Sequence, residues 1–295
     1  MGIDLNGGSG TFGALLRQWR LARHKSQLAL AVEADVSTRH VSFVETGRTH
    51  ASRDMVLLFA EVLEVPLRDR NLMLTSAGYA PVYSETPLSA PEMAPIRGAL
   101  EFILQRQEPY PALVIDRHWN VVLRNSASEH LWSLFVDMKA IPRDVARNVM
   151  RMVFDPRALR PWIVDWNRVA GGLLQTIHRE TMRGIADGET HRLLTDLLSY
   201  PGVPTSWSDA DCSLSKDAMM PFELRKDDLA LKLYSFNTTL GTPRDVTLQE
   251  IHIECFYPAD EATEELIRKL ADGLTFPAAS LQTDPSSHRR REALR

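Results

Sequence analysis

The chain has 295 residues, of which 44% are hydrophobic and 24% charged, and its formal net charge at pH 7 is −4. This length and composition are typical of a globular protein with two domains and a sizeable core, and they exclude a wholly disordered chain. No apolar run is long enough to span a membrane, the first residues lack the features of a secretory signal, and the two cysteines, Cys212 and Cys255, make no disulfide framework, so we expect a cytoplasmic protein.

The first part of the chain predicts five short helices. Apolar residues recur there at helical spacing, and serines in N-cap positions precede the second, third and fourth segments. Asp35 is placed for a tight turn after the second helix, and Gly47 for the end of the third. The expected helices cover residues 12–24, 27–34, 38–46, 53–63 and 67–77. Together they predict an all-α domain over residues 12–79.

Positive charge concentrates in the same region. Residues 11–53 hold seven Lys or Arg against three Asp or Glu, a formal charge of +4, so the rest of the chain carries −8. A basic segment on an acidic chain indicates that this domain meets a polyanion. From charge alone, chance clustering on a solvated face is the simpler interpretation.

Residues 26–48 have the pattern of a helix-turn-helix. Two short capped helices flank a brief turn, and a glycine ends the second of them. The face of that second helix that is not needed for packing holds Thr38, Arg39, Ser42 and Phe43. A helix with such a face fits the major groove of DNA, whereas the alternative is a structural hairpin with a solvated polar face. Because caps, spacing and charge agree, we predict binding to double-stranded DNA.

Residues 12–78 resemble the Cro/repressor-type (XRE) helix-turn-helix family. The resemblance lies in SQ at 26–27, VS at 36–37 and VETGR at 44–48. It implies a five-helix fold and a buried structural salt bridge between Arg20 and Glu45. The DNA contacts that it implies are Gln27 and Arg48 at phosphates, with Thr38, Arg39, Ser42 and Phe43 facing bases. Asp35 stands where the family usually has a turn glycine, and Asp tolerates the left-handed backbone of such a turn.

A proline-rich stretch follows. Residues 80–95 contain four prolines and predict a linker. A second domain is expected over residues 96–276. Residues 277–295 lack periodic apolar positions and predict a mobile C-terminal tail.

The second domain has a mixed pattern. Two β-branched runs within residues 112–124 predict a hairpin that turns at 116–118. Helices are expected over 126–135, 144–154, 162–182, 190–199 and 260–271, and further strands over 219–224, 229–238 and 248–257. This order predicts an α+β fold with a five-stranded antiparallel sheet and a helical bundle on one face.

The second domain shows no catalytic constellation. It lacks a nucleophile elbow, a phosphate loop and a zinc-protease motif, so we expect no enzymatic activity, no metal and no cofactor. His252 and Glu254 lie two residues apart on an expected strand and share a face, as metal ligands might. No third ligand is near them in the sequence, so the exposed polar face of a sheet is the favoured interpretation.

The large aromatic and aliphatic residues of this domain are more informative. A sensor linked to a DNA-binding module needs a mostly apolar cavity, and these residues supply the material for one. The expected lining residues are Trp132, Phe154, Trp162, Trp166, Leu231 and Phe256. The alternative for each of them is an ordinary place in a closed core.

Three stretches of this domain resemble the ligand-binding domain of MmyB-like regulators. They are residues 112–127, residues 147–174 and the closing strands. The resemblance implies a PAS-like fold and a fatty-acid-like ligand. It places Asn125 as a structural helix cap, and Arg147 and Asn148 at the family's RN pair, where we expect the ligand headgroup.

We therefore predict a DNA-binding transcription regulator that acts as a homodimer and senses an apolar, fatty-acid-like small molecule. Two alternatives remain open from the sequence. In one, the second domain only dimerises or binds a protein partner. In the other, the chain is an enzyme fused to a DNA-binding module.

Overall fold

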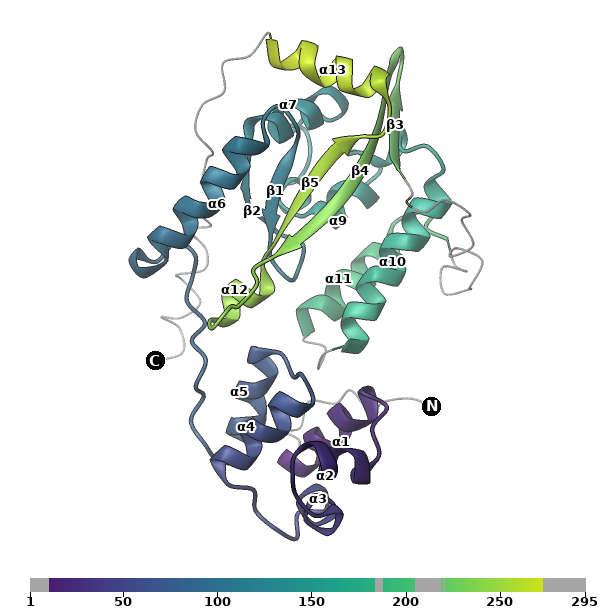
Figure 1. Ribbon diagram of the computed structural model, residues 1–295. Helices are drawn as coiled ribbons and strands as arrows, with labels where there is room; N and C mark the ends of the chain where they lie inside the picture. Colours follow the sequence, from purple (N-terminus) through teal and green to yellow (C-terminus); the bar gives the residue numbers. More distant parts are fainter. Residues whose placement is uncertain (1–10, 184–187, 205–218, 220, 273–295) are drawn as a thin grey trace. The chain divides into compact units, whose positions relative to one another are not determined.

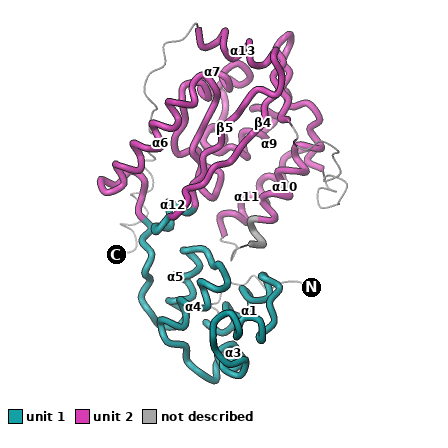
Figure 2. The backbone as a smooth tube through the Cα atoms, in the orientation of Figure 1, with its two compact units in different colours: residues 1–85, 180–186, 243–249 teal, residues 86–179, 187–242, 250–295 magenta. Residues whose placement is uncertain are grey.

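The computed structural model describes residues 11–183, 188–204, 219 and 221–272. It divides into two compact units (Figure 2): unit 1 holds residues 1–85, 180–186 and 243–249, and unit 2 holds the rest. The expected tail and Cys212 lie outside the described residues.

Unit 1 contains the five expected helices (Figure 1). They are α1 Phe12–Ala22, α2 Gln27–Glu33, α3 Thr38–Glu45, α4 Arg53–Val62 and α5 Leu67–Ser76. Three of them begin where a serine side chain accepts a backbone N–H three residues on: Ser26 from Ala29 at 3.0 Å, Ser37 from His40 at 3.1 Å and Ser52 from Met55 at 3.2 Å. These caps satisfy donors that the helix itself leaves unpaired, so they fix where each helix starts.

The turns of unit 1 follow the expected chemistry. Asp35 adopts a φ of 52° after α2, and Gly47 a φ of 71° after α3, so both expected left-handed positions are confirmed. Gly13 permits a close approach of α1 to α3, because a Cβ at this position would lie 2.5 Å from the carbonyl oxygen of Val44.

A buried ion pair joins α1 to α3, as the sequence predicted. Nε of Arg20 lies 2.6 Å from Oε1 of Glu45, and their side chains are only 8% and 3% exposed. Gln27 of α2 donates to the other carboxylate oxygen at 2.7 Å, and Arg20 also donates to the carbonyl of Lys25 at 2.8 Å. The hydrogen bond to Glu45 raises the pKa of Arg20 above its usual value. Three helices are therefore held by one carboxylate.

The sheet of unit 2 has five strands in the order β2-β1-β5-β4-β3, and every neighbouring pair is antiparallel. The strands are β1 Ala112–Ile115, β2 Val121–Arg124, β3 Phe222–Lys226, β4 Leu229–Thr239 and β5 His252–Pro258. The predicted five-stranded antiparallel sheet is confirmed, and β1 and β2 form the expected hairpin.

Helices accompany this sheet (Figure 1). Those of unit 2 are α6 Ala94–Gln107, α7 Ser126–Phe135, α8 Arg143–Ala146, α9 Val149–Phe154, α10 Trp166–Arg183 up to residue 179, α11 Gly188–Ser199 and α13 Glu261–Asp272, with short 3-10 turns η1 Pro91–Met93 and η2 Arg160–Trp162. A further helix, α12 Val246–Glu250, belongs to unit 1 except for its last residue. Asn125 caps α7 as expected, since its side chain accepts from the N–H of Ser128 at 3.0 Å. It also accepts from the N–H of Ala112 at 3.0 Å and donates to the carbonyl of Tyr110 at 2.8 Å, so it ties the helix to β1.

Several expected boundaries were wrong. The expected helix 144–154 is two helices, because Asn148 caps the second at Arg151. The expected strand 248–257 begins only at His252. Before it, the side chain of Asp245 accepts from the N–H of Thr247 at 2.8 Å and starts α12. The long helix starts at Trp166 rather than 162, and β3 lies at 222–226 rather than 219–224.

Helix α6 was not expected. Its second residue is Pro95, and a proline in the first turn of a helix starts it rather than breaks it. Leu113 and Ile115 of β1 join the main core with α7, α9 and α10. Side chains alternate along a strand, so Ala112 and Val114 face the other way, where α6 contacts β1. Helices therefore cover both faces of the sheet, not one as expected.

The ion pair of unit 1 gives a direct test of its core. We expect Glu45→Ala to lower the free energy of unfolding by about 3–5 kcal/mol, because Arg20 stays buried without its partner. Amide hydrogen exchange in α1 and α3 of the full chain measures the effect on unit 1 alone. Glu33→Ala removes the carboxylate of an exposed pair with Lys25 and should cost less than about 1 kcal/mol. Equal effects of the two changes would contradict this account.

Candidate functional site

Helices α2 and α3 pack through buried residues and leave the opposite side of α3 open. Leu30 and Ala31 of α2, and Val41 and Val44 of α3, are all buried. The four residues expected to face bases, Thr38, Arg39, Ser42 and Phe43, share the remaining face, and Arg39 is exposed. The structure thus brings the predicted base-facing residues together on one surface.

An aromatic ring on this surface lies against two arginines. The guanidinium carbon of Arg39 is 5.0 Å from the ring centroid of Phe43, and that of Arg48 is 5.8 Å from it. Such cation–π contacts hold positive charge beside an apolar group. Phe43 has no hydrogen-bonding group to offer a base, and its ring contacts both arginines. Gln27, by contrast, donates to buried Glu45 and is only half-exposed.

Unit 2 contains a cavity of about 420 Å³. It lies between one face of the sheet and helices α7, α9 and α10, and its volume is in the range of small-molecule sites. Its wall is mainly apolar and includes Leu113, Trp119, Trp132, Val153, Leu173 and Phe256. Gly172 of α10 keeps part of this space open, because a Cβ there would meet nothing within 4 Å.

Two of the predicted aromatic lining residues belong to this wall. Trp132 and Phe256 line the cavity and pack edge-to-face, with ring centroids 5.4 Å apart. Trp119, in the hairpin turn, lines it as well and was not predicted. Its φ of 65° is uncommon for so bulky a residue, and no local sequence pattern signals it.

The other four predicted apolar residues lie elsewhere in unit 2. Phe154 is fully buried and packs edge-to-face on Trp166 at 5.1 Å. Trp166 donates through Nε1 to the carbonyl of Gly202 at 2.9 Å. Trp162 is half-buried with Nζ of Lys226 5.0 Å from its ring, and Leu231 is fully buried in the core. Periodicity indicates which residues face the interior, but not which of them border a void.

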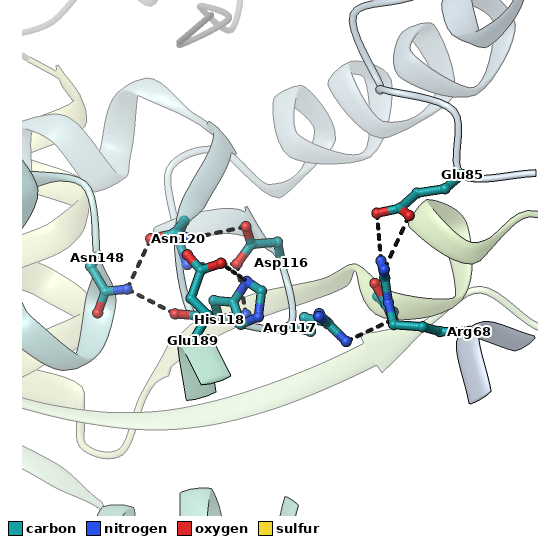
Figure 3. Close-up of polar contacts among 9 residues, drawn as sticks. Arg68, Glu85, Asp116, Arg117, His118, Asn120, Asn148 and Glu189 are labelled. Atoms are coloured by element: carbon teal, nitrogen blue, oxygen red, sulfur yellow. Dashed lines mark hydrogen bonds and ion pairs between the residues drawn. The ribbon is translucent and has the colours of Figure 1, made fainter. Parts of the chain in front are cut away.

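Asn148 is held in a structural network (Figure 3). Its side chain caps α9 and donates to the carbonyl of His118 at 2.8 Å and to Oδ1 of Asn120 at 3.0 Å. Asp116 in turn accepts from the N–H of His118 at 2.8 Å and from that of Asn120 at 2.9 Å. Asn148 therefore joins the hairpin turn to α9 and does not line the cavity.

Arg147 lines a second hollow, of about 520 Å³. Arg124 and Arg143 line it too, so it is basic in character. The two hollows share Arg124 and Trp132 in their walls. The structure thus places Arg147 beside the apolar cavity rather than in its wall.

The cavity wall also contains polar residues that were not predicted from the sequence. Arg124 is 7% exposed and Glu254 is 8% exposed, and both line the cavity. The expectation that His252 and Glu254 form an exposed polar face was wrong, because Glu254 is buried and His252 half-buried against Trp119. A signal was present: Glu254 lies two residues before Phe256, so strand alternation puts both on the core side.

Burial shifts the pKa values of both groups. Burial raises the pKa of Glu254, and a hydrogen bond from Oγ of Ser235 to Oε1, at 2.5 Å, opposes this only in part. Burial also lowers the pKa of Arg124, with nearby Glu129 acting against it and Arg147 with it. A carboxyl group with a raised pKa and a guanidinium with a lowered pKa therefore occupy one mainly apolar wall.

Comparison with known families agrees with this geometry. A family model described as the MmyB-like transcription regulator ligand binding domain matches residues 96–270, more than half of the chain. The chain belongs to the MmyB-like transcription regulators. A helix-turn-helix domain model matches residues 11–73 of this MmyB-like regulator, and no curated protein matches the chain. The predicted combination of a helix-turn-helix DNA-binding domain with a ligand-binding domain is confirmed.

The described residues of this MmyB-like regulator contain neither a candidate membrane span nor a candidate metal cluster. None of the helices there is long and apolar enough to cross a bilayer. Over the same ranges, no group of three or more His, Cys, Asp or Glu side chains is placed to hold a metal ion.

The protonation of Glu254 gives a pH-dependent prediction. A carboxyl group whose pKa is raised by folding binds more protons in the folded state, so stability falls as pH rises above the ordinary value of 4.5. Gln does not ionise, so we expect the free energy of unfolding of Glu254→Gln, relative to that of the wild type, to increase as the pH rises above 4.5. Urea denaturation of both proteins measures this difference.

Glu264 supplies the control for this experiment. Its pKa is lowered by the hydrogen bond from Arg268, so it is ionised throughout the same pH range. Glu264→Gln should change stability by an amount that does not vary with pH. A Glu254→Gln difference that is also constant with pH would show that Glu254 is ionised in the folded protein.

Proposed function

We propose that this regulator reads its operator through α3 and that unit 2 senses an apolar, fatty-acid-like small molecule in the cytoplasm. The observation that carries the ligand proposal is the 420 Å³ cavity with its mainly apolar wall. Both matched families are regulator domains, and we assign no catalytic step to the chain.

The hydrophobic effect is large enough for such a ligand. Each buried methylene contributes about 0.8 kcal/mol, so a chain of about a dozen carbons has a gross driving term of about 10 kcal/mol. Ordering the chain and losing its free motion offset part of this term. A net affinity in the micromolar range or tighter follows.

We further propose that the regulator binds DNA as a homodimer. One recognition helix reads few base pairs, and a two-fold dimer presents two such helices to half-sites about 34 Å apart. A ligand alters DNA binding only if it has different affinities for the DNA-competent and DNA-incompetent states. If the cavity is more open in one of these two states, the ligand binds that state more tightly and so shifts the equilibrium toward it.

Arg39 tests the role of α3. Because Arg39 is exposed on the face of α3 that we propose to read bases, we expect Arg39→Ala to cost about 1–3 kcal/mol of binding free energy at the cognate site and less on unrelated DNA. Arg106→Ala removes the same charge from exposed α6 and should leave both affinities unchanged. Fluorescence anisotropy on both DNAs measures the effect. Equal losses on cognate and unrelated DNA would show that Arg39 contacts only phosphate.

Gly172 tests the cavity. Gly172→Leu places a side chain in open space within the cavity, so we expect dodecanoic acid to bind at least about tenfold more weakly, because the leucine occupies the volume that the chain needs. The helix itself should gain about 0.5–1 kcal/mol, since glycine is unfavourable inside a helix.

Gly98→Leu is the matched control for Gly172→Leu. Gly98 is an exposed position of α6 where an added Cβ also meets nothing within 4 Å. Gly98→Leu should stabilise its helix by the same amount as Gly172→Leu, but outside the cavity. It should therefore leave the affinity for dodecanoic acid unchanged. Calorimetry with dodecanoic acid decides: equal binding by both variants and the wild type would remove the cavity from the proposal.

A further inference from the structure

One row of residues crosses four strands on the cavity side of the sheet. Arg124 of β2 pairs with Leu113 of β1, Leu113 pairs with Glu254 of β5, and Glu254 pairs with Asn237 of β4. Residues directly opposite one another in antiparallel strands share a face, and all four line the cavity. Two buried ionisable groups therefore flank one leucine in the same wall.

Each of these two groups has a polar atom without a partner. Over the described residues, five buried side-chain atoms make no hydrogen bond, and only two of them, Nε of Arg124 and Oε2 of Glu254, belong to the cavity wall. Nε of Arg124 forms an ion pair with Oε1 of Glu129 at 3.6 Å, a distance too long for a hydrogen bond, so its N–H has no hydrogen-bond acceptor. Buried polar groups normally find partners, so unpartnered atoms lining one cavity point to a ligand.

The two groups recognise different chemistry. A guanidinium is always charged and presents planar donors that match a carboxylate. Glu254 lies in a mainly apolar wall, with Ser235 on Oε1 and no hydrogen bond on Oε2. A carboxyl group there offers an acceptor and, when protonated, an O–H donor to an uncharged oxygen. The exposed amide of Asn237 lies beside it in the row. The wall is thus built for one anionic and one neutral polar group.

We propose that the ligand is an acyl chain with two polar groups at one end, a carboxylate bound by Arg124 and a hydroxyl or carbonyl oxygen bound by Glu254. Hydroxylated or oxidised fatty acids have this chemistry, and plain fatty acids lack it. The strands of the two residues are about 10 Å apart, and each side chain fills part of that gap. The two ligand groups therefore lie within a few bonds of each other. This inference rests on the proposed apolar ligand of unit 2.

Calorimetry on the full chain with three probes tests the inference. The probes are dodecanoic acid, 3-hydroxydodecanoic acid and 1-dodecanol. We expect the hydroxy acid to bind at least about tenfold more tightly than dodecanoic acid, because the unhydroxylated chain leaves Oε2 of Glu254 buried without a hydrogen bond.

Variants assign this preference to single residues. Glu254→Leu should bind the two acids equally, whereas Glu254→Gln should keep the preference because its amide still donates. Arg124→Met should weaken both acids at least about tenfold and leave 1-dodecanol unchanged, because only the acids carry the charge that Arg124 binds. Arg143→Met is the control, since Arg143 lines the second hollow but not the cavity.

The outcomes separate this inference from the function on which it rests. Equal binding of the two acids by the wild type, or a preference that survives in Glu254→Leu, overturns the two-group ligand while leaving an apolar sensor in place. Failure of all three probes to bind the wild type overturns both.

Discussion

Burying two ionisable side chains in an apolar wall is the constraint on which unit 2 depends. A charge in such a place is costly unless it is neutralised or paired. Glu254 accepts a hydrogen bond from Ser235, and its burial raises its pKa and so favours the neutral form. Arg124 forms an ion pair with Glu129 at 3.6 Å. The sheet register sets both residues beside Leu113, so the same row that builds the core also gives the cavity its polar end.

Unit 1 differs from unit 2 in that DNA binding requires charged side chains on its surface rather than in its interior. Serine caps and the Arg20–Glu45 pair fix three helices, which leaves α3 free to present polar groups. The guanidinium groups of Arg39 and Arg48 pack against the ring of Phe43. The rigid part of this surface and its charged part are thus specified by different residues, so the exposed side chains of α3 can vary without loss of the helix-turn-helix scaffold.

Local chemistry made much of the fold predictable. Caps, one glycine stop and periodic apolar residues predicted all five helices of unit 1, and β-branched runs with the order of the elements predicted the antiparallel sheet. The predictions failed where one local sequence pattern is compatible with two different structures. Pro95 begins α6 although the proline-rich run predicted only a linker, and Asp245 starts α12 inside an expected strand. The cavity wall was the least predictable part, because whether Trp132 borders a void while Phe154 is enclosed depends on packing between distant elements.

The central claim is that an acyl chain occupies the cavity of unit 2, and intermolecular NOEs test it most directly. Methyl-labelled protein with bound dodecanoic acid should show NOEs from the chain to Leu113, Val153 and Leu173, all of which line the cavity. Buried methyls of unit 1, such as those of Leu16 and Leu30, should show none. Bound acid that gives no NOE to the three cavity residues would contradict the account.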